Sequence, residues 1–159
     1  MNTIIMSVND IEEPPWLASY HLVCEKILAQ RNKTNWEVSV MLCSDRIMHQ
    51  LNMQYRQKDS PTDVLSFSQQ EGEGIPLHEE NGVCSAGDIV ISLDTIQRNA
   101  EKYSISMKEE LVRVFIHGLL HLEGYDHRSN NTDEPMLRLQ EQILQEEYSK
   151  NDFIEEKQS

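Results

Sequence analysis

The sequence predicts an α+β fold in which a small mixed sheet of about four strands packs against several helices. In the first half of the chain, segments with strand periodicity alternate with segments of helical periodicity, which favours parallel strand pairs. Two further strand-like runs then follow each other with no helix between them, so we expect those two to pair antiparallel. Helical spacing dominates the remainder. The predicted order is β-α-β-α-β-β-α-α-α.

The first half contains two predicted strands and two predicted helices. Residues 3–8 (TIIMSV) form a short apolar run, and apolar side chains alternate over 36–42, which is typical of a half-buried strand. Between these strands, Pro14 and Pro15 open a helix whose apolar positions recur every three or four residues. Ser44 can cap a second helix with one apolar face.

The middle of the chain predicts two short strands joined by a long connection. The strands are VLSF at 64–67 and DIVI at 88–91. Residues 69–86 are rich in Gly and Glu, so we expect a hairpin-like connection or a flexible loop there.

Three helices complete the predicted fold. One covers about 93–103, and the next begins at the capping-box pair Ser106 and Glu109. The second of these is apolar on nearly every face, so we expect it to be buried. The last covers about 133–148.

Length and charge suggest one domain with an acidic tail. A single domain is expected over residues 1–150 and a disordered acidic tail over 151–159. The net charge is −13, and the excess acids lie in 59–97 and 133–159. No run of residues is long and apolar enough to span a bilayer, and no leader is visible, so we expect a cytoplasmic protein without membrane or DNA partners.

The segment HGLLHLEGYDH at 117–127 predicts a metal centre. His117 and His121 are four residues apart on a helix, which places both imidazoles on one face. Gly124 lets the chain leave the helix, so that His127 can return as a third ligand. Three neutral imidazoles leave a tetrahedral Zn²⁺ one open position, which is the arrangement of a catalytic site. The sequence therefore predicts a zinc-dependent hydrolase.

The same spacing matches the long zinc-protease motif, except at one position. Gly118 stands where those proteases carry the Glu that activates water, which argues against a peptidase. Glu123 and Asp126 are substitutes by proximity, although we favour a hydrogen bond from Asp126 to a ligating imidazole.

Arg56 is the candidate catalytic residue. A guanidinium beside the metal would bind two phosphate oxygens in plane and stabilise charge in the transition state. The competing interpretation is a surface arginine at a helix end, where the helix dipole favours it.

The chain resembles the YbeY family of bacterial endoribonucleases. The resemblance lies in HGLLHLEGYDH at 117–127, LNMQYR at 51–56, PTDVLSF at 61–67 and GDIVIS at 87–92. It implies that the three histidines hold one Zn²⁺ per chain and that Arg56 is the functionally important arginine near that metal.

The resemblance also implies a biological task. The substrate would be single-stranded RNA, and the task 16S rRNA 3′-end maturation and ribosome quality control. Partners would be the ribosome or its small subunit, a small-subunit ribosomal protein and an assembly GTPase. Two alternatives stay open, a zinc-containing ribosome assembly factor without nuclease activity of its own, and the less favoured zinc peptidase.

Overall fold

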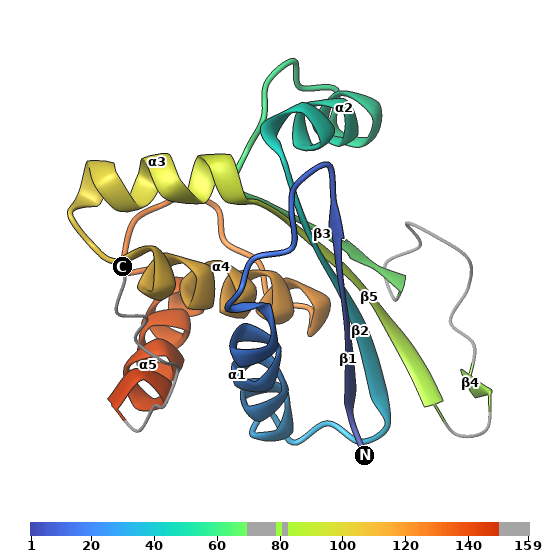
Figure 1. The fold of residues 1–159 in the computed structure, drawn as a ribbon. Coiled ribbons are helices and arrows are strands. Elements are labelled where there is room, and N and C mark those ends of the chain that lie inside the picture. The colour runs from blue at the N-terminus through green and yellow to red at the C-terminus, as the bar shows by residue number, and fades with distance from the viewer. Residues whose placement is uncertain (70–78, 81–82, 150–159) are drawn as a thin grey trace.

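The computed structural model describes residues 1–69, 79–80 and 83–149 and has the predicted α+β architecture (Figure 1). The described residues form a mixed sheet and five helices. In chain order the elements are β1 (Thr3–Asn9), α1 (Leu17–Ala29), β2 (Trp36–Cys43), α2 (Asp45–Arg56), β3 (Val64–Ser68), β4 (Glu79–Glu80), β5 (Val83–Ser92), α3 (Leu93–Tyr103), α4 (Met107–Leu122) and α5 (Pro135–Ser149).

The sheet has the predicted mixture of strand directions. Its order is β1-β2-β5-β3, with β4 paired to β5 beside this path. β1 and β2 are parallel, as are β2 and β5, whereas β3 and β5 are antiparallel. Among the described strands, β3 therefore lies at one edge of the main path.

The predicted connection over 69–86 is wrong in part. β5 begins at Val83 rather than at residue 88, because its first residues continue the ladder with β2, where Cys84 pairs with Trp36. The two-residue β4 pairs with the same end of β5. The rest of that prediction falls on 70–78 and 81–82, and the predicted tail falls on 151–159. All three ranges lie outside the described residues.

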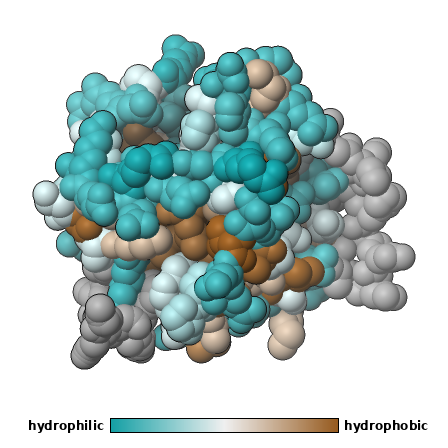
Figure 2. Space-filling view, turned by 45° about the horizontal axis from the view of Figure 1, so that its top comes forward, coloured by the Kyte–Doolittle hydropathy of each residue, from teal (hydrophilic) through white to brown (hydrophobic). Residues whose placement is uncertain are grey.

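Helices cover the two faces of the sheet unequally. α1 and α4 lie against one face (Figure 1), where they share the larger hydrophobic core with β1, β2 and β5. α2 packs on the opposite face through a smaller cluster of Cys43, Met48, Leu65 and Val90. None of the described helices has the length and apolar character needed to cross a membrane. In the space-filling view, hydrophobic side chains gather across the middle of a mostly hydrophilic face (Figure 2).

α4 is the central helix, as its apolar sequence predicts. It packs against α1, α3, α5, β3 and β5. The Tyr20 hydroxyl on α1 donates a buried hydrogen bond of 2.8 Å to the Leu111 carbonyl. The helix starts where predicted, because the Ser106 hydroxyl accepts a hydrogen bond from the Glu109 amide at 3.0 Å and thereby satisfies one of its unpaired N–H groups.

Removing this cap should weaken the fold. We expect Ser106→Ala to lower the free energy of unfolding by about 1 kcal/mol, because one amide of the first turn loses its acceptor. Urea titration followed by circular dichroism measures the change. Ser106→Thr, which keeps a capping hydroxyl, should retain most of the stability, and equal losses in both variants would contradict a capping role.

Candidate metal centre and adjoining pocket

The structure brings the three predicted histidines together. His117 and His121 project from successive turns of α4, and His127 follows the helix end. The ring centroids are 4.8 Å apart for His117 and His121, 5.2 Å for His117 and His127, and 5.5 Å for His121 and His127. One nitrogen from each ring lies within 4.8 Å of the other two, so this group could hold a metal ion.

The end of α4 returns His127 to the helix. The Tyr125 amide donates to the Leu120 carbonyl at 3.0 Å, and the Gly124 amide donates to the His121 carbonyl at 3.0 Å. This pair of hydrogen bonds is the Schellman motif, which requires a left-handed residue between the helix and the outgoing chain. Gly124 supplies it with φ of +105°, although a Cβ there would meet nothing within 4 Å. The positive φ, rather than a lack of room for a side chain, therefore explains why glycine stands at position 124.

The hydrogen bonds of the rings select one tautomer for all three histidines. His121 Nδ1 lies 3.1 Å from the Tyr125 carbonyl, and His127 Nδ1 lies 2.8 Å from the Ser129 carbonyl. His117 Nδ1 lies 2.7 Å from Gln140 Oε1. A carbonyl oxygen only accepts, so each Nδ1 carries the proton and each Nε2 keeps a lone pair. The three Nε2 atoms are thus available as ligands if the group holds a metal ion.

Gln140 contacts the histidine cluster, and the sequence prediction did not include it. Its amide Nε2 donates to Glu141 Oε2 at 3.0 Å, which turns Oε1 toward His117. Burial raises the pKa of Glu141, but hydrogen bonds from Arg113 and Gln140 outweigh burial and lower that pKa overall. Arg113 binds both oxygens of Glu141, at 2.8 and 3.0 Å. A chain of hydrogen bonds from Arg113 through Glu141 and Gln140 therefore fixes the orientation of the His117 ring.

Burial also favours the ligand form of the imidazoles. It is the main cause that lowers the pKa of His117, although the hydrogen bond to Gln140 acts in the opposite direction. Burial likewise lowers the pKa of His121, and the neighbouring rings of His117 and His127 add to the effect. Both residues are therefore neutral at pH 7, which is the state that binds a metal.

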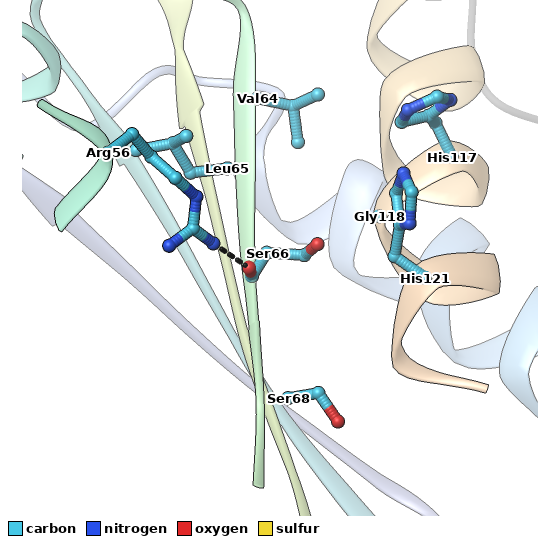
Figure 3. A pocket seen from close by; sticks show the side chains of 8 residues that line it. All are labelled: Arg56, Val64, Leu65, Ser66, Ser68, His117, Gly118 and His121. Carbon is cyan, nitrogen blue, oxygen red and sulfur yellow. Dashed lines mark hydrogen bonds between the residues drawn. The ribbon is translucent and has the colours of Figure 1, made fainter. Parts of the chain in front are cut away.

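Arg56 lines the same pocket as the helical histidines (Figure 3). This pocket, of about 240 Å³, is called the metal pocket below and lies between α4 and β3. The Arg56 guanidinium donates to the Ser66 carbonyl on β3 at 2.9 Å and lies over the Phe67 ring, 4.9 Å from its centroid. A helix-end arginine is thus held at the edge strand that faces His117 and His121.

Close packing at Gly118 explains why this chain lacks the glutamate of the protease motif. A Cβ at this position would lie 2.9 Å from Cγ2 of Ile89, a fully buried residue of β5. Any larger side chain there would push α4 away from the sheet. The helix contact, rather than the chemistry of the pocket, therefore requires glycine.

The two nearby carboxylates have other partners. Glu123 binds Arg31 through two hydrogen bonds of 3.0 Å, and its side chain is 4% exposed. Asp126 accepts a hydrogen bond of 2.8 Å from the His127 amide, so it contacts the main chain of the third histidine, whereas we had expected it to bond an imidazole. The imidazoles use Gln140 and two main-chain carbonyls instead.

The fold and the site define a class of protein. An α+β domain that gathers three imidazoles able to hold a metal ion, two of them lining a pocket, resembles a metal-dependent hydrolase. A family model described as Endoribonuclease YbeY matches residues 6–147, and the chain belongs to this family. The resemblance seen in the sequence is thereby confirmed.

Individual relatives agree with this assignment. A Treponema denticola protein named Endoribonuclease YbeY is 43% identical over 148 residues, which cover 90% of this chain and 92% of that protein. The protein of the same name from Bacillus subtilis is 44% identical over 110 residues, covering 68% and 70% of the two chains. The solution structure of a Thermotoga maritima protein matches with a TM-score of 0.60 and 28% identity, covering 90% of this chain and 87% of that one.

The hydrogen bond from Gln140 predicts a measurable effect on metal binding. We expect Gln140→Leu to weaken Zn²⁺ binding by about tenfold or more, because His117 loses the acceptor that orients it. Gln140→Glu keeps an acceptor and should bind at least as tightly as the wild type. Competition with a chromogenic chelator measures the affinity.

Gln142→Leu makes the same chemical change at an exposed position of α5 and serves as the control. Equal affinities of the Gln140→Leu and Gln142→Leu variants would refute the orienting role of Gln140.

Proposed function

We propose that this protein is a zinc-dependent endoribonuclease that cleaves single-stranded RNA. The observation that carries the proposal is a cluster of three imidazoles, two of which line the metal pocket together with the Arg56 guanidinium. The curated relatives are named as endoribonucleases, which supports a phosphodiester substrate. Because phosphodiester cleavage builds negative charge on phosphoryl oxygens, it needs the cationic groups that this pocket offers.

The donor set favours zinc at one ion per chain. Neutral imidazole is a preferred ligand of Zn²⁺, and among the described residues the group contains three of them, which leaves a fourth tetrahedral position for water or substrate. When bound, Zn²⁺ would lower the pKa of water toward about 7 and polarise a phosphoryl oxygen. The protein holds its ligands in the required tautomer through Gln140, the Tyr125 carbonyl and the Ser129 carbonyl.

Arg56 is the residue of this chain that would act on the phosphodiester. Its guanidinium is positioned by the Ser66 carbonyl and the Phe67 ring, so it is already placed before substrate binds. A planar guanidinium can bind two oxygens of one phosphate and neutralise charge as the bond breaks. We assign it transition-state stabilisation rather than metal binding.

Membership of the family supports a biological role, which forms part of the proposal. We propose a cytoplasmic role in 16S rRNA 3′-end maturation and ribosome quality control, with the small subunit, one of its proteins and an assembly GTPase as partners. A zinc-containing assembly factor is the second candidate, favoured by the net charge of −13, which opposes RNA binding. Position 118 has no room for the glutamate side chain that a zinc peptidase needs there, which disfavours the peptidase.

Two variants separate the proposed roles. With labelled single-stranded rRNA, the wild type should carry about one zinc per chain and cut the RNA. His121→Ala should lose metal and cleavage together, whereas Arg56→Ala should keep its metal and lose most of the cleavage rate, by a factor of about 100. Metal analysis and gel-based rates provide the two readouts.

Matched controls come from the same chain. His21→Ala removes an imidazole that bonds the Ile4 carbonyl, and Arg46→Ala removes an arginine at the other end of α2 that pairs with Asp10. Both should behave as the wild type. Zinc binding without cleavage by the wild type would leave the assembly factor as the better proposal. A cyclic phosphate on the product would assign the attack to the RNA 2′-hydroxyl, and its absence would assign it to water.

A further inference from the structure

A second pocket lies on the opposite face of the sheet, across β3 from the metal pocket. Its volume is about 410 Å³, within the range of roughly 300–1,000 Å³ that small-molecule sites occupy. We call it the sheet pocket. Strands β1, β2, β5 and β3 form its floor, and α2 forms a wall. Its lining includes Ser39, Asp88, Phe67, Tyr55 and Ser68.

The strand register places a carboxylate between a hydroxyl and an aromatic ring. Asp88 on β5 pairs with Ser39 on β2 and with Phe67 on β3, so the three residues form one row across the sheet. All three line the sheet pocket. Burial raises the pKa of Asp88, while a hydrogen bond from Ser39 opposes this rise. A half-buried carboxylate in such a row is an acceptor for N–H groups and repels phosphate.

Aromatic side chains form the wall beside this carboxylate. The Tyr55 and Phe67 rings meet edge to face, with centroids 5.2 Å apart, and Tyr55 is 49% exposed. Arg56 covers the Phe67 ring and also lines the metal pocket, and Ser68 lines both pockets. The two pockets therefore adjoin at β3, where they share Ser68 and where Arg56 of one contacts Phe67 of the other.

We propose that the sheet pocket binds a nucleobase of the RNA whose phosphate lies in the metal pocket, with guanine as the preferred base. The proposal rests on the endoribonuclease function above. Proteins that bind single-stranded RNA stack splayed bases on aromatic side chains and read their Watson–Crick edges by hydrogen bonds. Tyr55 and Phe67 provide the stacking surface here, and Asp88 provides the acceptor.

Guanine matches this acceptor better than the other bases. Its N1–H and N2–H₂ donors are adjacent and can bind both oxygens of one carboxylate. Cytosine and adenine offer the carboxylate an amino group next to an acceptor nitrogen. Uracil offers one N–H between two carbonyl oxygens, which a carboxylate repels. The structure thus orders the bases with guanine first and uracil last.

A single-position substitution in the RNA tests the preference without changing the protein. Otherwise identical uridine-rich oligonucleotides carry guanosine, inosine or uridine at each position next to the cleaved bond. Inosine lacks only the N2 amino group. At one position, guanosine should raise kcat/KM by about tenfold over inosine and by more over uridine. Fluorescence anisotropy with the same RNAs gives binding as a separate readout.

Protein variants assign the preference to this pocket. Asp88→Asn should bring the guanosine-to-inosine ratio close to one, and Tyr55→Ala should weaken binding of every RNA by about tenfold. Tyr103→Ala, an exposed tyrosine at the end of α3, is the control and should match the wild type.

The outcomes separate this proposal from the function on which it rests. If the wild type cuts no RNA but binds guanosine RNA preferentially, and Asp88→Asn removes that preference, the nucleobase site stands and the nuclease function fails. If the wild type cuts all RNAs equally, and both pocket variants match Tyr103→Ala in rate and binding, the nucleobase site is refuted while the nuclease stands. A protein partner would then be the better candidate occupant of this face.

Discussion

The contact between Gly118 and Ile89 sets the distance between the histidine-bearing helix and the sheet. A side chain at position 118 would collide with Ile89, so the close approach of α4 depends on glycine. This approach brings His117 and His121 into one pocket with β3 and Arg56. It also removes the position from which zinc proteases present their catalytic glutamate. One packing constraint therefore both shapes the pocket and leaves no room for a glutamate at position 118.

A second constraint links the backbone turn after α4 to the tautomer of the histidine rings. The Schellman turn at Gly124 brings His127 back toward the helix. The Tyr125 carbonyl, which belongs to the same turn, accepts the Nδ1 proton of His121. Chain reversal and tautomer selection are thus produced by a few consecutive residues. A group that could hold a metal ion is therefore preformed by local structure with one long-range addition, Gln140.

The sequence predicted the local parts of the structure and some long-range ones, such as the mixed strand pairing, and missed others. Histidine spacing, the helix cap at Ser106 and the turn at Gly124 depend on neighbours within a few residues, which a periodic pattern reveals. Gln140 is 23 positions from His117, and its one visible signal was a polar residue on the apolar face of the last helix. The early start of β5 depends on pairing with β2, which its own composition does not show.

The edge strand β3 positions a positive charge in an otherwise acidic chain. The chain carries a net charge of −13, and among the described residues that line the metal and sheet pockets, Arg56 is the one with a permanent positive charge. Proteins that hold nucleic acid through many phosphate contacts need many such cations. An acidic nuclease has fewer such cations to offer. In this fold the candidate metal ligands, one guanidinium and the aromatic wall of the sheet pocket lie around β3, because Arg56 crosses its edge between the metal pocket and that wall.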